Sequence, residues 1–279
     1  MIDSGFIIRN MKMYFRQKSN IFYALMAVII VVALYAAFLY DMYVKPEYAS
    51  VMDPWLIAGI VSLATLAEPL SAYGLYVDDV VKGRFRDFFV SPIQRAKIML
   101  GYILTAVIIG MLVCIAIFAC GLGFMAMKGY VLPDAIACLG CIGVIFLSTL
   151  ASCGLMFFII CFVKTTGAFS GVSTIVGTAS GFLMGLYVPI GNFAPSVQAV
   201  IGGFPLTHGA AVLRDLMTAP GLAEMIPDTV AREEFQIEMG IRFGEVGNLM
   251  SEWTSIAILV VCFAAFFLLG YAVLRRRRA

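Results

Sequence analysis

Six long runs of apolar residues, separated by shorter polar segments, dominate the pattern along this chain. A helix needs about 20 residues to cross a hydrocarbon core of about 30 Å, and each run is long enough. The spans must be helical, because lipid offers no hydrogen-bond partner to free backbone groups. The pattern therefore predicts an all-α integral membrane protein with six transmembrane helices, at residues 20–40, 55–77, 98–127, 134–163, 168–188 and 253–274.

The segment before the first run interleaves apolar and basic positions. Residues 1–19 predict an amphipathic helix that lies in the membrane interface. The alternative is an ordinary extension of the first span. The apolar face of the predicted helix consists of Phe6, Ile7, Met11, Tyr14 and Phe15.

Two further elements are predicted between the fifth and sixth spans. Residues 189–217 are moderately apolar but are interrupted by prolines and glycines, so each piece is too short to cross. Broken helices at membrane depth are tolerated where they pack on protein or line a cavity, and we expect two short re-entrant helices here. Residues 218–251 are acidic and predict a small soluble element on the outer side. The sequence contains no linker that would mark a second domain, so we expect residues 1–279 to form a single transmembrane domain.

Composition agrees with a lipid environment, because 62% of the residues are hydrophobic and only 13% are charged. A soluble domain averages about a quarter charged residues. All seven cysteines lie in apolar runs, which is typical of small core side chains and not of a disulfide framework. The one histidine, His208, is expected to make local hydrogen bonds.

Basic residues gather in four segments: the N-terminal tail, the loop 78–97, Lys164 and the C-terminal run Arg275–Arg278. The positive-inside rule places all four segments, and with them both termini, in the cytoplasm. The sequence contains no phosphate-binding GxxxxGK[ST] loop and no HExxH metal motif. We therefore expect no enzyme activity, cofactor or metal in this chain, and no nucleic-acid partner.

Glu68 lies near the middle of the second span, followed by Pro69. A carboxylate at that depth costs several kcal/mol unless it is paired or hydrated. One interpretation is a protonated group, or one bonded to a neighbouring Ser, Thr or Tyr. The other is a group that lines a hydrated path.

Small residues recur every four positions along the fifth span. This spacing creates a flat ridge on which another helix can approach closely. The partner helix could belong to the same subunit, or to a second copy beside a transport path. The stripe consists of Ser173, Gly177, Gly181 and Gly185.

The loop 78–97 is a dense cluster of charge between two apolar runs. Phe85, Phe88 and Phe89 have the i, i+3, i+4 spacing of one helical face, and Pro92 would end that helix. The loop could serve only to fix topology, or it could be a docking helix for a soluble protein.

Two blocks of the sequence resemble the ABC-2 type transporter permeases, the membrane subunits of drug, polysaccharide and lipid exporters. The first block is Asp79, Lys82, Gly83, the run Val90–Ile93, Arg95 and Gly101. The second block is Gly185, Pro189, Pro195, Pro205, Leu206 and Arg214. Their order and spacing carry the resemblance, together with six spans and the amphipathic start.

The resemblance implies an ATP-driven exporter in which two permeases form the path through the plasma membrane, expected in a bacterium. Two separate ATPase subunits would bind ATP and magnesium. Contact with them would involve Asp79, Lys82, Gly83, Arg84, Phe85, Arg86, Phe88, Ser91 and Pro92. The path would involve Glu68 and the stripe, and an external gate would involve Pro189, Pro195, Pro205 and Arg214.

The cargo expected from this reading is drug-like, lipidic or otherwise amphipathic. Two rival hypotheses remain at the level of sequence. One is a secondary transporter that is driven by an ion gradient through Glu68. The other is a membrane scaffold or immunity protein that transports nothing.

Overall fold

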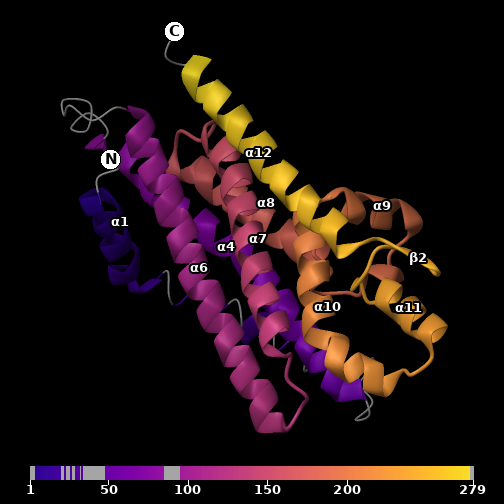
Figure 1. Ribbon diagram of the computed structural model, residues 1–279. Helices are drawn as coiled ribbons and strands as arrows, with labels where there is room; N and C mark the ends of the chain where they lie inside the picture. Colours follow the sequence, from indigo (N-terminus) through magenta and orange to yellow (C-terminus); the bar gives the residue numbers. More distant parts are fainter. Residues whose placement is uncertain are drawn as a thin grey trace.

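The computed structural model describes residues 4–19, 48–84 and 95–276, together with the isolated positions 22, 26, 29–31 and 33. The described part is helical apart from one two-stranded hairpin (Figure 1). Its helices are α1 (Ser4–Arg16), α4 (Ala49–Val81), α6 (Arg95–Lys128), α7 (Ala135–Ile160), α8 (Thr166–Leu183), η3 (Ile190–Asn192), α9 (Pro195–Gly203), α10 (Pro205–Met225), α11 (Thr229–Glu238) and α12 (Glu252–Arg276). The hairpin pairs β1 (Gly244–Glu245) with β2 (Asn248–Leu249).

Four helices in the described part are long and apolar enough to cross a membrane: α4, α6, α7 and α12. They overlap the predicted spans at 55–77, 98–127, 134–163 and 253–274 and confirm a long apolar helix at each. Most of the predicted first span lies outside the described residues. The fifth, α8, has 18 residues and is not among these four. The six-span count therefore stays a prediction.

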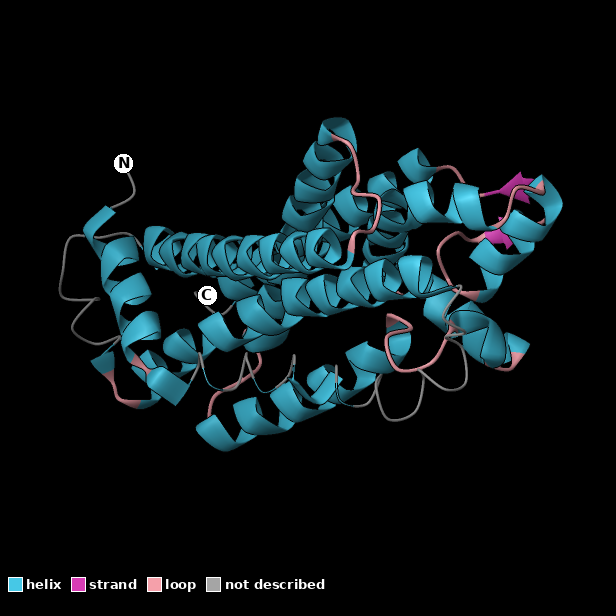
Figure 2. Ribbon diagram, turned by 90° about the horizontal axis from the view of Figure 1, so that it is seen from below, coloured by secondary structure: helices cyan, strands magenta, loops and turns pink. Residues whose placement is uncertain are grey.

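The long helices form a bundle (Figures 1 and 2). Figure 1 shows that α4, α7 and α12 run in one direction and α6 and α8 in the other. Glycines allow close approach: a Cβ at Gly110 would lie 2.8 Å from Thr149, and one at Gly154 would lie 3.1 Å from the Phe263 carbonyl oxygen. Pro69 packs on Gly110 of α6. The helix α4 continues through Pro69 without a break.

One end of the bundle carries most of the described basic residues. There α4, α7 and α12 end, α6 and α8 begin, and α1 packs beside α6 and α4. We call this the basic end, which is marked by Arg9, Lys97, Lys164, Arg275 and Arg276. The segments that charge assigned to one side of the membrane thus share one end of the fold.

The opposite end carries the segment between α8 and α12. As predicted, it contains a broken helix pair: α9 and α10 meet at Phe204–Pro205 with a bend of 92°. Proline suits the first turn of α10 because its missing N–H would have no partner there. The second helix is longer than predicted, since α10 continues through Pro220 to Met225. The acidic element from 218 therefore begins inside α10 and then forms α11 and the hairpin.

Candidate functional site

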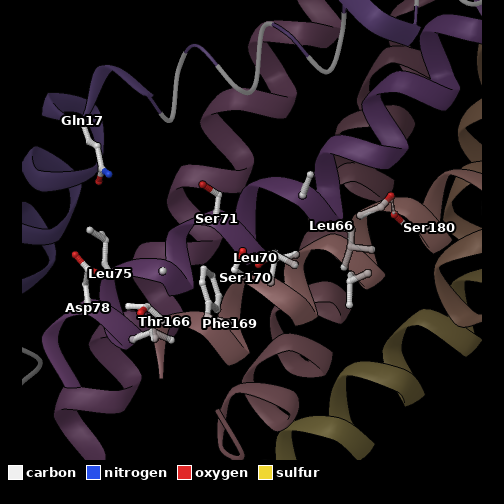
Figure 3. Close-up of a pocket in the computed structure, with 16 residues that line it drawn as sticks. Gln17, Leu66, Leu70, Ser71, Leu75, Asp78, Thr166, Phe169, Ser170 and Ser180 are labelled. Carbon is white, nitrogen blue, oxygen red and sulfur yellow. Dashed lines mark hydrogen bonds between the residues drawn. The ribbon is translucent and has the colours of Figure 1, made fainter. Parts of the chain in front are cut away.

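A cavity of about 500 Å³ lies between α4 and α8, close to Gln17 at the end of α1 (Figure 3). Its wall mixes hydrocarbon and hydroxyl groups, as a site for an amphipathic molecule would. The apolar part is Leu66, Leu70, Leu75, Phe169 and Val176, among others. The polar part is Ser71, Asp78, Thr166, Ser170, Ser173 and Ser180, with Gln17 at one edge.

The small-residue stripe divides into three parts. Ser173 and Gly177 line the α4–α8 cavity. Gly181 is buried against the ring of Tyr187, which folds back over the end of α8. Gly185 lies beyond the helix with φ of +61°, a left-handed conformation that glycine adopts readily. Of the stripe, Ser173 and Gly177 are thus the two residues that line this cavity.

Glu68 is hydrogen-bonded to the N-terminal helix. Its side chain is only 5% exposed, and it accepts a 2.7 Å bond from the hydroxyl of Tyr14. The same hydroxyl lies 3.5 Å from Ser71 Oγ, a residue of the cavity wall. Burial and the nearby charge of Glu68 raise the pKa of the Tyr14 phenol above its ordinary value, so this hydroxyl stays protonated and donates. Glu68 therefore has a tyrosine partner, although one from α1, 54 positions away.

Replacing Tyr14 by phenylalanine should separate the ring's packing from its hydrogen bond. The variant leaves the Glu68 carboxyl without this donor. We therefore expect the free energy of unfolding to fall by about 1–3 kcal/mol. Thermal unfolding in detergent measures the effect, and hydrogen exchange in α1 should rise. Phe15→Leu, at an exposed position beside it, is the control. Unchanged stability of Tyr14→Phe would contradict the role of this bond.

A second polar cluster lies at the basic end, around Asp79. The Asp79 side chain is 0% exposed and, within the part of the chain that the structure describes, accepts four hydrogen bonds from three elements. Arg9 of α1 donates at 2.9 and 3.2 Å, Arg84 at 2.9 Å, and the Tyr102 hydroxyl of α6 at 2.6 Å. We call these four residues the Asp79 junction. Burial alone would lower the pKa of the Arg9 guanidinium, but its bonds and charge interaction with Asp79 raise it above the ordinary value.

Four of the nine predicted ATPase-contact residues are described: Asp79, Lys82, Gly83 and Arg84. Lys82 is exposed and pairs with Asp78, and Gly83 ends α4 with φ of +73°. Asp79 is buried, so it does not present a surface to another protein. The other predicted residues lie outside the described part: Phe85, Arg86, Phe88, Ser91 and Pro92. Sequence reasoning missed the pairing of Arg9 and Tyr102 with Asp79.

Arg214 is fully buried at the other end of the bundle, where it joins three segments. It donates to the carbonyl of Gly185 at 2.9 Å and to that of Gly240 at 3.4 Å. Its guanidinium stacks 4.4 Å from the ring centroid of Trp55, whose Nε1 donates to the Met239 carbonyl at 2.9 Å. Two residues of the second sequence block, Gly185 and Arg214, are thus in direct contact.

The prolines predicted at the external gate set the starts of helices. Pro189 precedes η3, Pro195 begins α9 and Pro205 begins α10. His208 lies near this bend, where its ring nitrogens are 3.0 Å from the Gly202 carbonyl and 3.3 Å from Ser255 Oγ. It makes the local bonds expected of it.

An ion-pair cluster that sequence reasoning assigned no role holds the α11–hairpin segment in place. Arg242 donates to Asp215 of α10 at 2.8 Å and to Glu252 of α12 at 2.9 Å. Gln236 of α11 donates to the same Asp215 at 3.2 Å. The positions are too far apart along the chain for spacing to reveal them.

Comparison with known proteins identifies a family for most of the chain. The family described as ABC-2 family transporter protein matches residues 84–272. The matched region begins at Arg84 and continues into α12, so it includes α8, the bent pair and Arg214. No curated protein matches the sequence.

Proposed function

This chain belongs to the ABC-2 family of transporter proteins, and from that membership we propose that it is the permease subunit of an ATP-driven exporter. It is a multi-pass membrane protein and corresponds to the membrane domain of such transporters, which carries no nucleotide-binding domain. The family match carries the proposal. ATP and magnesium would therefore bind to a separate ATPase subunit, and a second permease would complete the path.

The proposed topology has six spans in one domain over residues 1–279, with both termini in the cytoplasm. It is supported by the grouping of basic segments at one end of the bundle, since charge of this kind marks the cytoplasmic side. The bent pair and the α11–hairpin segment would then face outward. The gate residues Pro189, Pro195, Pro205 and Arg214 would shape the exit.

The loop 78–97 is proposed as the docking site for the ATPase. The absence of a phosphate-binding loop in this sequence makes a separate ATPase necessary to the scheme. Lys82 and Gly83 lie at the basic end, which the charge rule turns toward the cytoplasm. The contact surface itself would come from Arg84, Phe85, Arg86, Phe88, Ser91 and Pro92.

The α4–α8 cavity is proposed as one side of the cargo path, with a second permease copy supplying the other side. Its mixed wall suits drug-like, lipidic or other amphipathic molecules. Gly177 would face the cargo directly, and Ser173 belongs to the same wall. Glu68 lies behind this wall and would contribute through Tyr14 and Ser71.

Co-purification tests the proposal. The chain is expressed with each ABC ATPase subunit of its own cell in turn, and any complex is placed in vesicles that contain a fluorescent amphipathic dye. We expect the ATPase to co-purify and dye movement to require ATP. Dye transport that does not require ATP but stops when the proton gradient is collapsed would favour the secondary transporter. A chain that binds no ATPase and moves no dye would favour the scaffold hypothesis.

Gly177→Leu should obstruct the cavity. Nothing lies within 4 Å of a Cβ placed at Gly177, so the larger side chain fits without strain and occupies cavity space. We expect the rate of dye transport to fall about tenfold while the ATPase still binds. A tenfold change corresponds to about 1.4 kcal/mol. Gly171→Leu is the matched control, because Gly171 is equally open on α8 but does not line the cavity. Equal transport by both variants would remove the cavity from the path.

A further inference from the structure

The Asp79 junction joins three parts of the chain that are far apart in sequence. Arg9 lies 70 positions before Asp79, Tyr102 lies 23 positions after it, and Arg84 lies 5 positions after it, beyond the end of α4. We propose that Asp79 is a positioning residue that makes α1 and the base of the docking loop move together. The inference rests on the proposed docking of an ATPase at that loop.

Burial separates this role from direct contact with a partner. The Asp79 carboxylate is 0% exposed, whereas the two guanidinium side chains are 31% and 41% exposed. The carboxylate therefore lies deeper in the fold than the two guanidinium groups and is bonded to both. Arg84 is the third residue after the end of α4 and bonds directly to Asp79, so a force on the loop would reach Asp79 through it.

The position of Asp79 in its helix supports this reading. It lies in the last turn of α4, where the partial negative charge of the helix end disfavours a carboxylate. Removing one partner from a buried charge pair is strongly destabilising, because the remaining charge is left uncompensated. Asp79 thus tolerates this position only while its donors stay in place, and that requirement ties the three elements together.

The other contacts of α1 make it suitable as a rigid arm. Phe6 fills the space above Gly101 on α6, where a Cβ would lie 2.6 Å from its ring. Asn10 is fully buried and donates to Thr105 at 3.4 Å. With the Tyr14–Glu68 bond, these contacts fix α1 along both α4 and α6. A displacement at Arg84 would therefore be passed to two spans and to the cavity wall between α4 and α8.

The first experiment measures coupling in the complete complex with its ATPase in lipid nanodiscs. Asp79→Asn keeps the size of the side chain and removes its charge. We expect the ATPase to co-purify, but the ATP hydrolysis rate per bound ATPase to fall about tenfold, with the KM for ATP unchanged. Asp79→Glu should recover most of the rate. Asp53→Asn is the matched control, because Asp53 also lies on α4 and accepts a tyrosine hydroxyl, at 2.7 Å from Tyr130.

A double-mutant cycle tests whether Arg9 acts through Asp79. Arg9→Gln alone should lower the rate, and adding it to Asp79→Asn should have no further effect. Additive losses would overturn the proposal, as would an Asp79→Asn complex with the wild-type rate. A loss that Asp79→Glu does not recover at all would also count against it.

The second experiment needs no ATPase, so it distinguishes failure of this inference from failure of the proposed function. Spin labels at Lys12→Cys and Lys82→Cys report the distance between α1 and the loop base, after Cys120 and Cys138 are replaced by serine. We expect one narrow distance distribution in the otherwise wild-type permease and a broad one with Asp79→Asn. Equally narrow distributions would overturn the inference even if the ATPase docks. A broad distribution with Asp79→Asn, together with no ATPase co-purified in the first experiment, would sustain the link and overturn only the docking function.

Discussion

Replacing Arg214 by alanine is expected to lower the free energy of unfolding by about 3–5 kcal/mol. The side chain is fully buried, so its removal leaves a cavity beside Trp55. It also leaves the carbonyls of Gly185 and Gly240 without their donor. Because those carbonyls belong to the turn after α8 and the turn after α11, both turns should loosen together. Chemical unfolding of the detergent-solubilised protein measures the loss, and proteolysis near residues 240–250 should become faster.

Two variants make this result specific to the buried contacts. Arg232 also donates to two backbone carbonyls, those of Ile226 and Pro227, but near the surface, so Arg232→Ala should cost little. Arg214→Lys keeps a positive charge but loses the planar group that stacks on Trp55 and binds two carbonyls, so it should fall between wild type and alanine. If Arg214→Ala were as stable as Arg232→Ala, Arg214 could not be the group that holds this end of the fold.

The second large effect is expected from the docking loop. Replacing Arg84, Phe85 and Phe88 together by alanine should reduce ATP hydrolysis coupled to transport to background, while the permease still inserts into the membrane. Aromatic and arginine side chains commonly supply most of the binding energy of an interface, and two of these residues are aromatic. Co-purification of the ATPase and dye transport in vesicles measure the loss.

The control for the loop uses the same kinds of side chain at the same end. Phe162 is exposed beyond α7, and Lys164 is exposed two positions later. Replacing both by alanine should leave the bound ATPase and its activity unchanged. Arg84→Ala should also be compared with the Phe85 and Phe88 pair, because Arg84 belongs to the Asp79 junction as well. A triple variant that retains normal coupled activity would remove the loop from the docking site.

Hydropathy predicted the four long spans because lipid requires continuous apolar helices of a fixed length, a property visible in local composition. It was less accurate at helix ends. The four-residue spacing of small residues continues from Gly181 to Gly185, but α8 ends at Leu183. Only the backbone conformation shows that Gly185 forms a turn. The same limit applies to α10, which continues into a polar segment predicted to lie outside it.

The sequence pointed to several residues of the candidate site but not to their hydrogen-bond partners. Glu68 stood out because a mid-span carboxylate needs a partner, yet nothing near it in sequence pointed to Tyr14. Arg9 was counted only as one of several basic residues that fix orientation. Its bond to Asp79 depends on how α1 packs, which is a property of the tertiary structure. The resemblance placed Asp79 in the contact with an ATPase, and burial now favours an indirect role.

The contact between Arg214 and Trp55 gives the protein an optical reporter of its own. The chain has only two tryptophans, Trp55 and Trp253. Trp253 is 78% exposed, so Trp253→Phe should leave a single emitter with little disturbance. The remaining indole is fully buried and lies between a guanidinium and the Met239 carbonyl. Its emission wavelength and lifetime would register, in real time and without any label, a displacement of Arg214 during the ATPase cycle.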